Sequence, residues 1–491
     1  MRIPRTLAIA GVVLLVGLPG TAAPQTEPRS FTIAAAGDII PHGMLVDAGN
    51  AHVPGPGYDF TPMVRDIEPW VSSADLSICH LEGTLSATNT GISGYPRFVG
   101  PREMADAIVA AGWDTCSTAS NHAYDAGWPG VVSTLEVLDA AGLHHTGTAR
   151  TEAERLPALY EVNGVTIGHL AFTYGTNGLP VDPDHPYAVN LLDADAILAD
   201  ATWAREHGAE FTVVSLHWGS EYHVTPTNQQ AVLAETLLAS DDIDLILGHH
   251  AHIVQPIDRI GHKYVVYGMG NHLSNQNIRW GPQYFATEDG LMVMVRVAER
   301  SDGGFAVEGI DLVPTWVQLG TYRVLSAADA LLTGAAPLAA LQASFERTSA
   351  RARMLEAPNV YPAANPWPEV SCAGIRATIV GTPDDDIITG TDGNDVIVGR
   401  GGDDVIDGGA GADVICGGPG ADMLTGGPGR DLLLGCSVTG TGITGHNAIA
   451  GAFDFLACDE GDVVVDESDP TLALAGGAIC AAVARLRLCV R

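Results

Sequence analysis

The sequence from residue 381 to residue 434 reads GTPDDDIIT GTDGNDVIV GRGGDDVID GGAGADVIC GGPGADMLT GGPGRDLLL, which is six consecutive units of nine residues. Aspartate occupies the sixth position of every unit, and isoleucine or leucine occupies the eighth. The glycines permit tight turns that bring backbone carbonyls close to an ion, and the aspartates supply the carboxylate oxygen that calcium prefers. Because the aliphatic residues can stack on their equivalents in neighbouring turns, the stretch predicts a calcium-binding repeat. Its expected calcium ligands are Asp386, Asp395, Asp404, Asp413, Asp422 and Asp431.

These units resemble the RTX, or haemolysin-type, calcium-binding repeat, and the resemblance implies a parallel β-roll. Without calcium, a ladder of aspartates repels itself, and a small aliphatic core cannot offset the conformational entropy lost on folding. We therefore expect residues 381–434 to fold only when calcium binds, at the ~millimolar concentrations typical of extracellular modules. The repeat then serves as an accessory module that stabilises or tethers the rest of the chain.

The composition indicates several domains and a strongly acidic surface. A chain of 491 residues is too long for one core, so two or three domains are expected. It carries 58 acidic and 24 basic residues, for a net charge of -34. A field of that sign repels phosphate backbones and attracts cations, which argues against a nucleic-acid partner.

The first 25 residues have the pattern of an export signal. Arg2 and Arg5 precede an uncharged apolar run from Leu7 to Leu18, and small residues follow at positions 20–23. An uncleaved membrane anchor is the alternative, although the run is shorter than the ~20 residues that span a bilayer. We expect a secreted or cell-surface protein, including one associated with the cell wall.

The eight cysteines are consistent with a location outside the cytoplasm, where disulfides can form. Six of them lie in the last quarter of the chain. An even number clustered in a glycine-rich region of an exported protein indicates disulfides, although their pairing does not follow from the sequence. Cys79 and Cys116 stand on two separate apolar runs. They either pair with each other or remain buried thiols.

From residue 31 to residue 324, apolar runs of strand length alternate with amphipathic stretches of helix length. Strands are expected at 31–36, 75–80, 115–119, 165–172, 211–216, 243–247 and 264–267, with helices at 103–111, 130–141, 194–207 and 229–240. This alternation predicts an α/β fold of layered sheets, and two strands without an intervening helix, at 291–297 and 305–313, predict an antiparallel edge or a second sheet. A helical extension and a proline-rich linker are expected at 325–371, before a cysteine-containing region at 372–491.

Residues able to bind metals recur just after the predicted strands, where α/β folds place their sites. A His-x-His pair on a loop presents two imidazoles, and a carboxylate between two cations can bridge them. Each group alone is weak evidence, but five in order, each at a strand end, indicate a metal centre. The groups are Gly37-Asp38, His80-Leu81-Glu82, Asn121-His122, His217-Trp218-Gly219 and His249-His250-Ala251-His252.

Here the sequence resembles the CapA family of poly-γ-glutamate capsule biosynthesis proteins, whose fold is that of calcineurin-like metallophosphoesterases. The resemblance covers about residues 31–280 and rests on GD, LEG, NHAYDAG, HWGSEY, GHHAHIVQP and YGMGNH. It implies a four-layer αββα domain with a divalent metal such as Mn, Zn or Fe at its loops. The positions matching metal ligands in such folds are Asp38, Glu82, Asn121, His217, His250 and His252.

The resemblance also implies roles for residues that do not bind the metal. His122 matches a residue that protonates the leaving group, and Asp125, three residues on, is expected to orient it. Tyr95 and Arg97 are candidates for substrate contact, with a structural role as the alternative. Glu221 either ligates a metal or lies beside the ligands and the substrate.

Three departures from the family pattern leave the activity open. Metallophosphoesterases usually carry Asp-x-His in the first loop, where this chain has Asp38 and then His42, and Gly-Asp-x-x-Asp in the second, where this chain has Glu82 in place of the acid. CapA-like chains usually have Asn where His80 stands. These differences put the number of bound metals in question. The chain is expected to be a metal-dependent hydrolase acting on an anionic polymer such as poly-γ-glutamate. A non-catalytic polymer-binding or anchoring protein and a secreted phosphoesterase are the alternatives.

Overall fold

The computed structural model describes residues 28–333, 338–363, 371–372, 375–381, 385–399, 403–417, 422–429 and 431–434, and the short strands 448–450, 453–457, 463–465 and 473–474. The export signal predicted for residues 1–25 lies outside the described residues, as do four of the cysteines and most of the apolar segment 472–484. Among the helices of the described part, none is long and apolar enough to cross a bilayer.

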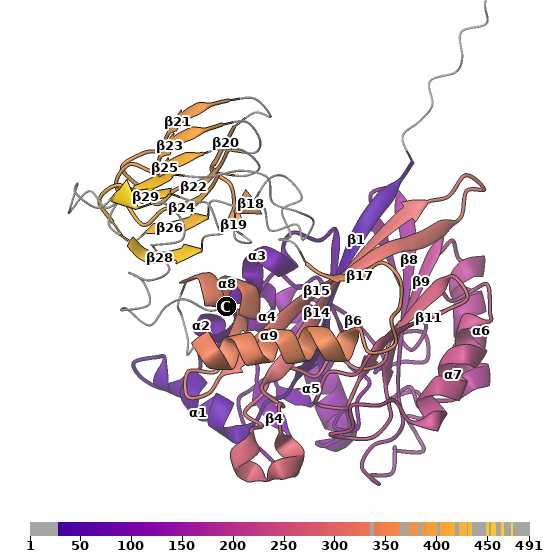
Figure 1. The fold of residues 1–491 in the computed structure, drawn as a ribbon. Coiled ribbons are helices and arrows are strands. Elements are labelled where there is room, and N and C mark those ends of the chain that lie inside the picture. Colours follow the sequence, from indigo (N-terminus) through magenta and orange to yellow (C-terminus); the bar gives the residue numbers. More distant parts are fainter. Residues whose placement is uncertain are drawn as a thin grey trace, which may run out of the picture.

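The first sheet is mixed, in the order β16-β15-β14-β1-β2-β5-β6 (Figure 1). Its parallel half contains β1 (Ser30–Ile39), β2 (Leu76–Leu81), β5 (Thr115–Ser117) and β6 (His144–Thr146). Its antiparallel half contains β14 (Asp289–Glu299), β15 (Phe305–Gln318) and β16 (Arg323–Ser326), which confirms the predicted antiparallel edge. The short strand β13 (Asn271–Leu273) also pairs with β1.

The second sheet has the order β11-β12-β10-β9-β8-β7. Its strands are β7 (Ala158–Val162), β8 (Val165–Thr173), β9 (Phe211–His217), β10 (Leu245–His249), β11 (Ile257–Ile260) and β12 (Lys263–Val266). The crossovers run through α6 (Ala194–Glu206) and α7 (Asn228–Leu238), and a capping box of Thr227 and Gln230 begins α7.

The two sheets pack face to face because β1 is apolar on both sides. Phe31, Ile33 and Ala35 enter the core shared with the second sheet, while Ala34 and Ala36 face the helices. This alternation follows the two-residue period of a strand. The helices against the first sheet include α1 (Gly43–Ala51), α2 (Thr61–Val64), α3 (Glu68–Val71), α4 (Glu103–Ala110) and α5 (Gly127–Ala141), and α6 and α7 cover the second. The layers are therefore α, β, β and α, as predicted.

The helical extension predicted after residue 325 forms α8 (Ala327–Thr333) and α9 (Leu338–Ala352). Part of the predicted linker is structured, since β17 (Val360–Pro362) pairs with β15 in parallel. Proline is tolerated in a strand at an edge or end, where no partner requires its missing N–H. The first unit of the structure thus continues to at least Pro362.

Two disulfides are formed among the described cysteines. Cys79 and Cys116 face each other in the register of β2 and β5, so the paired alternative is confirmed and the buried-thiol alternative is wrong. Cys372 pairs with Cys416 and joins the strand before the repeats to the fourth unit.

The repeats and the segments beside them form two sheets, β20-β22-β24-β26-β28 and β21-β23-β25-β27-β29-β30, which Figure 1 shows as stacked arrows. Neighbouring strands are parallel except β29 and β30, which are antiparallel. Within the repeats, consecutive strands of one sheet are 18 residues apart, so each turn of the roll takes two units; Ile397 pairs with Ile415 in this way. The eighth residue of every unit lies in one apolar cluster, which confirms the predicted inward stacking. The roll strands are Ile379–Val380, Ile387–Thr389, Val396–Val398, Val405–Asp407, Val414–Cys416, Met423–Thr425, Asp431–Leu434, Ala448–Ala450, Phe453–Ala457, Val463–Val465 and Ala473–Leu474.

Candidate metal centre

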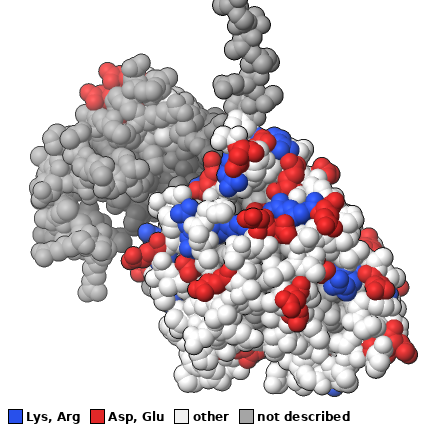
Figure 2. Space-filling view, turned by 90° about the vertical axis from the view of Figure 1, so that its right-hand side faces the viewer, with Lys and Arg blue, Asp and Glu red and all other residues white. Residues whose placement is uncertain are grey.

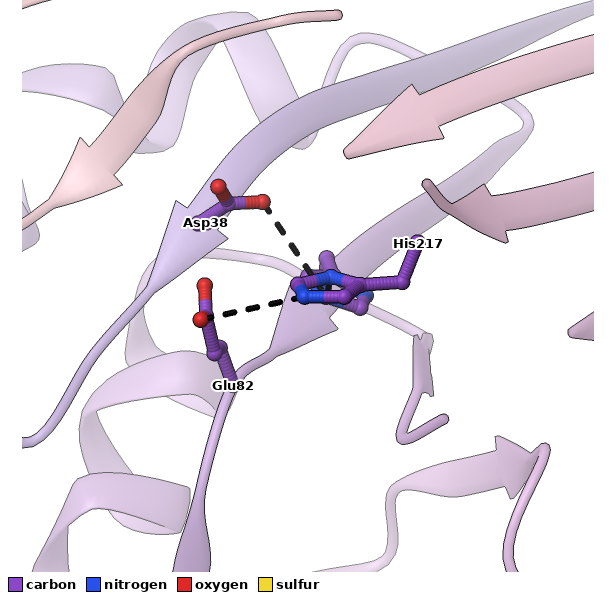
Figure 3. Close-up of side chains that lie close together, drawn as sticks. Asp38, Glu82 and His217 are labelled. Carbon is purple, nitrogen blue, oxygen red and sulfur yellow. Dashed lines mark hydrogen bonds and ion pairs between the residues drawn. The ribbon is translucent and has the colours of Figure 1, made fainter. Parts of the chain in front are cut away.

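The candidate metal centre lies where strands of both sheets end. Asp38 is near the end of β1, Glu82 directly follows β2, and His217 ends β9. Figure 3 shows the Glu82 carboxylate directed towards the imidazole of His217, which comes from the other sheet, with Asp38 close by. Parallel strands that end at the same edge bring their following loops together, so residues far apart in sequence converge here.

The backbone around these residues is tightly constrained. A Cβ atom on Gly37 would overlap the carbonyl of Gly270, so only glycine fits beside β13 before Asp38. His250 and His252 have φ values of 85° and 54°, a left-handed conformation that non-glycine residues seldom adopt. Such strain persists where surrounding structure over-determines it, which is typical of functional sites.

The structure brings together all six predicted metal-ligand residues, and all are buried. His217 Nε2 lies 2.9 Å from Asn121 Oδ1 and 3.8 Å from Glu82 Oε1. His252 Nδ1 lies 3.1 Å from Asp38 Oδ2, and its Nε2 lies 3.9 Å from Glu82 Oε1. Potential ligand atoms of Glu82, His250 and His252 lie within 4.8 Å of one another, as do those of Asp38, His80, Glu82 and His217. Glu82 belongs to both groups and is placed to bridge them.

The residues present fit a divalent transition metal. Glu82 Oε2 and His250 Nδ1 are buried without a hydrogen-bond partner in the described structure, although an orphaned buried polar atom is costly. A bound cation would satisfy both atoms. Mixed imidazole, carboxylate and amide donors suit metals such as Mn, Zn or Fe.

The electrostatics of the cluster also favour a cation. Burial raises the pKa of Glu82 well above its usual value. Burial likewise lowers the pKa of His217 well below the ordinary histidine value, so its imidazole is held neutral and available as a ligand. For His252, burial opposes protonation, but the carboxylates of Glu82 and Asp38 outweigh it and raise the pKa.

The predicted acid and its orienting partner form a buried pair. His122 Nδ1 lies 2.6 Å from Asp125 Oδ2, which also accepts the backbone N–H of Phe98 at 2.6 Å. The carboxylate is therefore fixed from two sides and holds the ring of His122. Asp125 engages Nδ1, while Nε2 makes a longer contact with the Asn177 amide at 3.4 Å, so Nε2 is the atom available to exchange a proton with a substrate.

A pocket of about 420 Å³ opens over the centre, and the three predicted substrate contacts line it. Tyr95 is 84% exposed, Arg97 is exposed, and the Glu221 carboxylate lies 3.7 Å from His252 Nε2. Arg97 is the only lysine or arginine among the lining residues. Aromatic rings form much of the remaining wall, including Phe98 and Trp280.

Several residues at the centre are not among the predicted metal ligands. His80 and His249 belong to two of the predicted metal-binding groups, but no role is predicted for either. His80 pairs with Asp38 in the register of β1 and β2 and joins the ligand cluster. His249 stacks on His80 with ring centroids 3.9 Å apart. Asn271 Oδ1 lies 3.1 Å from His252 Nδ1. The YGMGNH motif contained a signal for Asn271, whereas His80 and His249 required the strand register.

The predicted calcium ligands in the roll are not equivalent. The Oδ1 atoms of Asp404 and Asp413 each accept a backbone N–H from the unit two before. Their Oδ2 atoms are buried without a hydrogen-bond partner in the described part of the roll, as expected for a calcium site. Asp395 differs, because Thr391, at a position that is glycine in three of the six units, donates both its N–H and its hydroxyl to Asp395 Oδ2.

A four-layer αββα domain with a cluster of histidine and carboxylate ligands at its strand ends defines the class of the first unit: it has the calcineurin-like metallophosphoesterase fold. Residues 32–276 match the family model described as bacterial capsule synthesis protein PGA_cap. Residues 380–415 and 416–435 match the RTX calcium-binding nonapeptide repeat. The chain therefore carries a PGA_cap domain followed by RTX calcium-binding repeats.

Similar proteins have names connected with capsules. The capsule biosynthesis protein CapA of Bacillus anthracis is 27% identical over 313 residues, which cover 62% of this chain and 71% of that protein. The PGA biosynthesis protein CapA of Bacillus subtilis is 29% identical over 217 residues, covering 43% and 54%. Among solved structures, the calcineurin-like phosphoesterase YfkN from Bacillus subtilis is 14% identical with a TM-score of 0.37, covering 65% of this chain and 97% of that chain.

Proposed function

We propose that the chain is a metal-dependent hydrolase that acts outside the cytoplasm on an anionic polymer such as poly-γ-glutamate during capsule biosynthesis. One observation carries the proposal: the buried ligand cluster, the His122–Asp125 pair and Arg97 share a single pocket. This pocket combines places for a cation, a proton donor and an anion anchor. The names of the Bacillus relatives support the choice of polymer.

In this proposal, the six residues Asp38, Glu82, Asn121, His217, His250 and His252 would hold the divalent metal, with Glu82 common to both ligand groups. Bound divalent ions would polarise the bond to be cleaved and lower the pKa of water. His122 delivers a proton from Nε2 to the leaving group, while Asp125 retains Nδ1. Arg97 holds a carboxylate or phosphate of the substrate through its guanidinium.

The charge distribution limits how a polyanion can bind. Arg97 is the one lysine or arginine among the described residues that line the pocket, and the chain as a whole has a charge of -34. On the face shown in Figure 2, acidic and basic side chains are interleaved, so no continuous basic track crosses that face. We propose that the protein engages a short anionic segment at the pocket and not a long stretch of polymer.

Two other functions are distinguished by what the protein does to its ligand. A metal-stabilised anchoring protein would retain the polymer without shortening it, with the roll as its attachment device. A secreted phosphoesterase would cleave p-nitrophenyl phosphate with manganese and leave polyglutamate intact. In all three cases, residues 1–25 are proposed to direct export and the roll to fold in external calcium.

Replacing His122 with asparagine is expected to lower turnover by roughly 10²- to 10⁴-fold, because a positioned general acid contributes about that factor. Metal content should be unchanged, since His122 is not among the proposed ligands. The measurement is the initial rate of polyglutamate shortening together with elemental analysis. His185→Asn, a histidine stacked on Trp128 in another loop, is the matched control and should retain full activity. Full activity in H122N would contradict the assigned role.

A further inference from the structure

We infer that His80 is a positioning residue that holds the metal ligand His217, and that it is not itself a ligand. The inference rests on the proposed metal centre, because it concerns how one ligand of that centre is oriented. It assigns a role to the residue at which this chain departs from the family pattern.

Both ring nitrogens of His80 are already engaged. Its Nδ1 lies 2.7 Å from Ser117 Oγ, and its Nε2 lies 2.9 Å from His217 Nδ1. The carboxylate oxygen Asp38 Oδ1 lies farther from the ring than these two partners, at 4.0 Å from Nε2. His249 stacks against the ring at 3.9 Å, and the side chain of His80 is 1% exposed. The ring is therefore enclosed and aimed at His217.

The register of the first sheet produces this alignment. His80 on β2 is the direct partner of Ser117 on β5, and the preceding pair in the same register is Cys79 with Cys116. The disulfide between those cysteines prevents the strands from slipping past each other at this point. Ser117 Oγ consequently stays beside His80 Nδ1.

Metal binding requires a particular arrangement of protons on His217. Its Nε2 faces Asn121 Oδ1 and Glu82 Oε1, so Nε2 must present a lone pair to the ion, and Nδ1 must carry the proton. A metal-ligating histidine nearly always donates its other N–H to an acceptor, which fixes both tautomer and ring orientation. His80 Nε2, at 2.9 Å, is that acceptor.

His80 Nε2 can accept a hydrogen bond only if the proton of the His80 ring is on Nδ1, and Ser117 permits this tautomer. When His80 Nδ1–H donates to Ser117 Oγ, the hydroxyl hydrogen can turn to the carbonyl of Cys79, 3.3 Å away. Every donor in the series then has an acceptor: His217 to His80, His80 to Ser117, and Ser117 to Cys79.

Without metal, the hydrogen bonds that join His217, His80 and Ser117 can all have the opposite donor and acceptor. Asn121 Oδ1 accepts a proton from His217 Nε2, His217 Nδ1 accepts from His80 Nε2, and His80 Nδ1 accepts from Ser117. Each imidazole holds one proton in either direction. If a metal bound at His217 Nε2, that nitrogen would lose its proton to solvent, the His80 Nε2 proton would move to His217 Nδ1, and His80 Nδ1 would take up one proton from solvent, so the number of protons would not change.

The test uses the full-length protein, with metal affinity measured by titration of metal-free samples with zinc. His80→Leu removes the acceptor and is expected to weaken affinity by roughly 10- to 100-fold, the range for loss of such a partner. In His80→Gln, the amide oxygen occupies nearly the place of Nε2, so affinity should return to within about threefold of the parent. Unchanged affinity in H80L, with folding verified by circular dichroism, would overturn the inference.

A spectroscopic measurement separates a positioning role from ligation. In protein labelled with ¹⁵N-histidine and loaded with cadmium-113, coupling to the metal is expected at His217 Nε2 and absent at both nitrogens of His80. A proton should be seen on His217 Nδ1. Coupling at His80 would show that it is a ligand and would overturn the inference. If His217→Ala also binds metal as the parent does, the proposed centre itself fails, which is a distinct outcome.

Discussion

Replacing both His250 and His252 with alanine is expected to remove the transition metal from the first domain and to lower turnover by roughly 10⁴-fold or more, as does loss of an essential catalytic group. Each of these residues contributes to a ligand cluster with Glu82, and both lie on the loop that follows β10. Loss of both imidazoles removes the two histidine partners of Glu82 in one of its two ligand groups.

The fold should survive this double substitution. His250 and His252 lie outside the main apolar cores, and their backbone is held by contacts such as the His250 N–H to Asp38 Oδ2 at 3.3 Å. The measurements are elemental analysis, turnover and thermal melting. The matched control replaces His207 and His262, two exposed histidines on the outer parts of the second sheet and its helices. A double variant that keeps its metal or its turnover would show that the centre lies elsewhere.

Removing calcium is expected to unfold residues 381–434 while the first domain stays folded. The six aliphatic residues of the roll form a small core, and the Oδ2 atoms of Asp404 and Asp413 are buried without a hydrogen-bond partner in the described structure. Burying such carboxylates without a cation is costly. Hydrogen exchange by mass spectrometry reports on this segment in the intact chain and should show loss of protection when calcium is chelated.

The Cys372–Cys416 disulfide should lower the calcium concentration that the roll requires. The cross-link spans 44 residues of sequence, and closing a loop of that size stabilises the folded state by about 4 kcal/mol in the chain-entropy model. Replacing both cysteines with serine is therefore expected to raise the calcium concentration at half-folding. Full protection of 381–434 without calcium, in the parent and the double serine variant alike, would contradict this prediction.

Acidification provides a further check on the calcium-free roll. Burial, reinforced by neighbouring acids, raises the pKa of Asp404 and Asp413 in the folded state above the unfolded value. Their contribution to stability is fully present below the unfolded pKa, and it is lost as pH rises through the folded pKa. Lowering the pH from neutrality towards the ordinary aspartate range should therefore increase hydrogen-exchange protection in the absence of calcium.

Much of the architecture follows from local patterns in the sequence. The alternation of strand-length and helix-length segments predicts the layered domain, because alternating strands and helices place the helices on the faces of the sheets. The nine-residue period predicts the roll, since Ile397 and Ile415 occupy equivalent positions two units apart. The pairing of β17 with β15 was not predicted, because a proline-rich segment resembles a linker unless its partner strand is known.

The sequence predicts the site residues that belong to recognisable motifs, but not those whose role depends on packing between strands. Asp38, Asn121 and His217 follow strands in recognisable motifs. The role of His80 depends on its register with Ser117 and on contact with His217 from the other sheet, which local sequence does not specify. Likewise, only the structure reveals that Thr391 donates two hydrogen bonds to the carboxylate of Asp395.

The central claim is that the first domain is a metal-dependent hydrolase of an anionic polymer. Its most direct test is to load the purified full-length protein with manganese, measure bound metal, and follow the length distribution of poly-γ-glutamate over time. The proposal predicts shortening of the polymer that requires the metal and is lost in the His250→Ala, His252→Ala double variant. Retention of the polymer at constant length by the metal-loaded parent would contradict the claim and identify the chain as a binding protein.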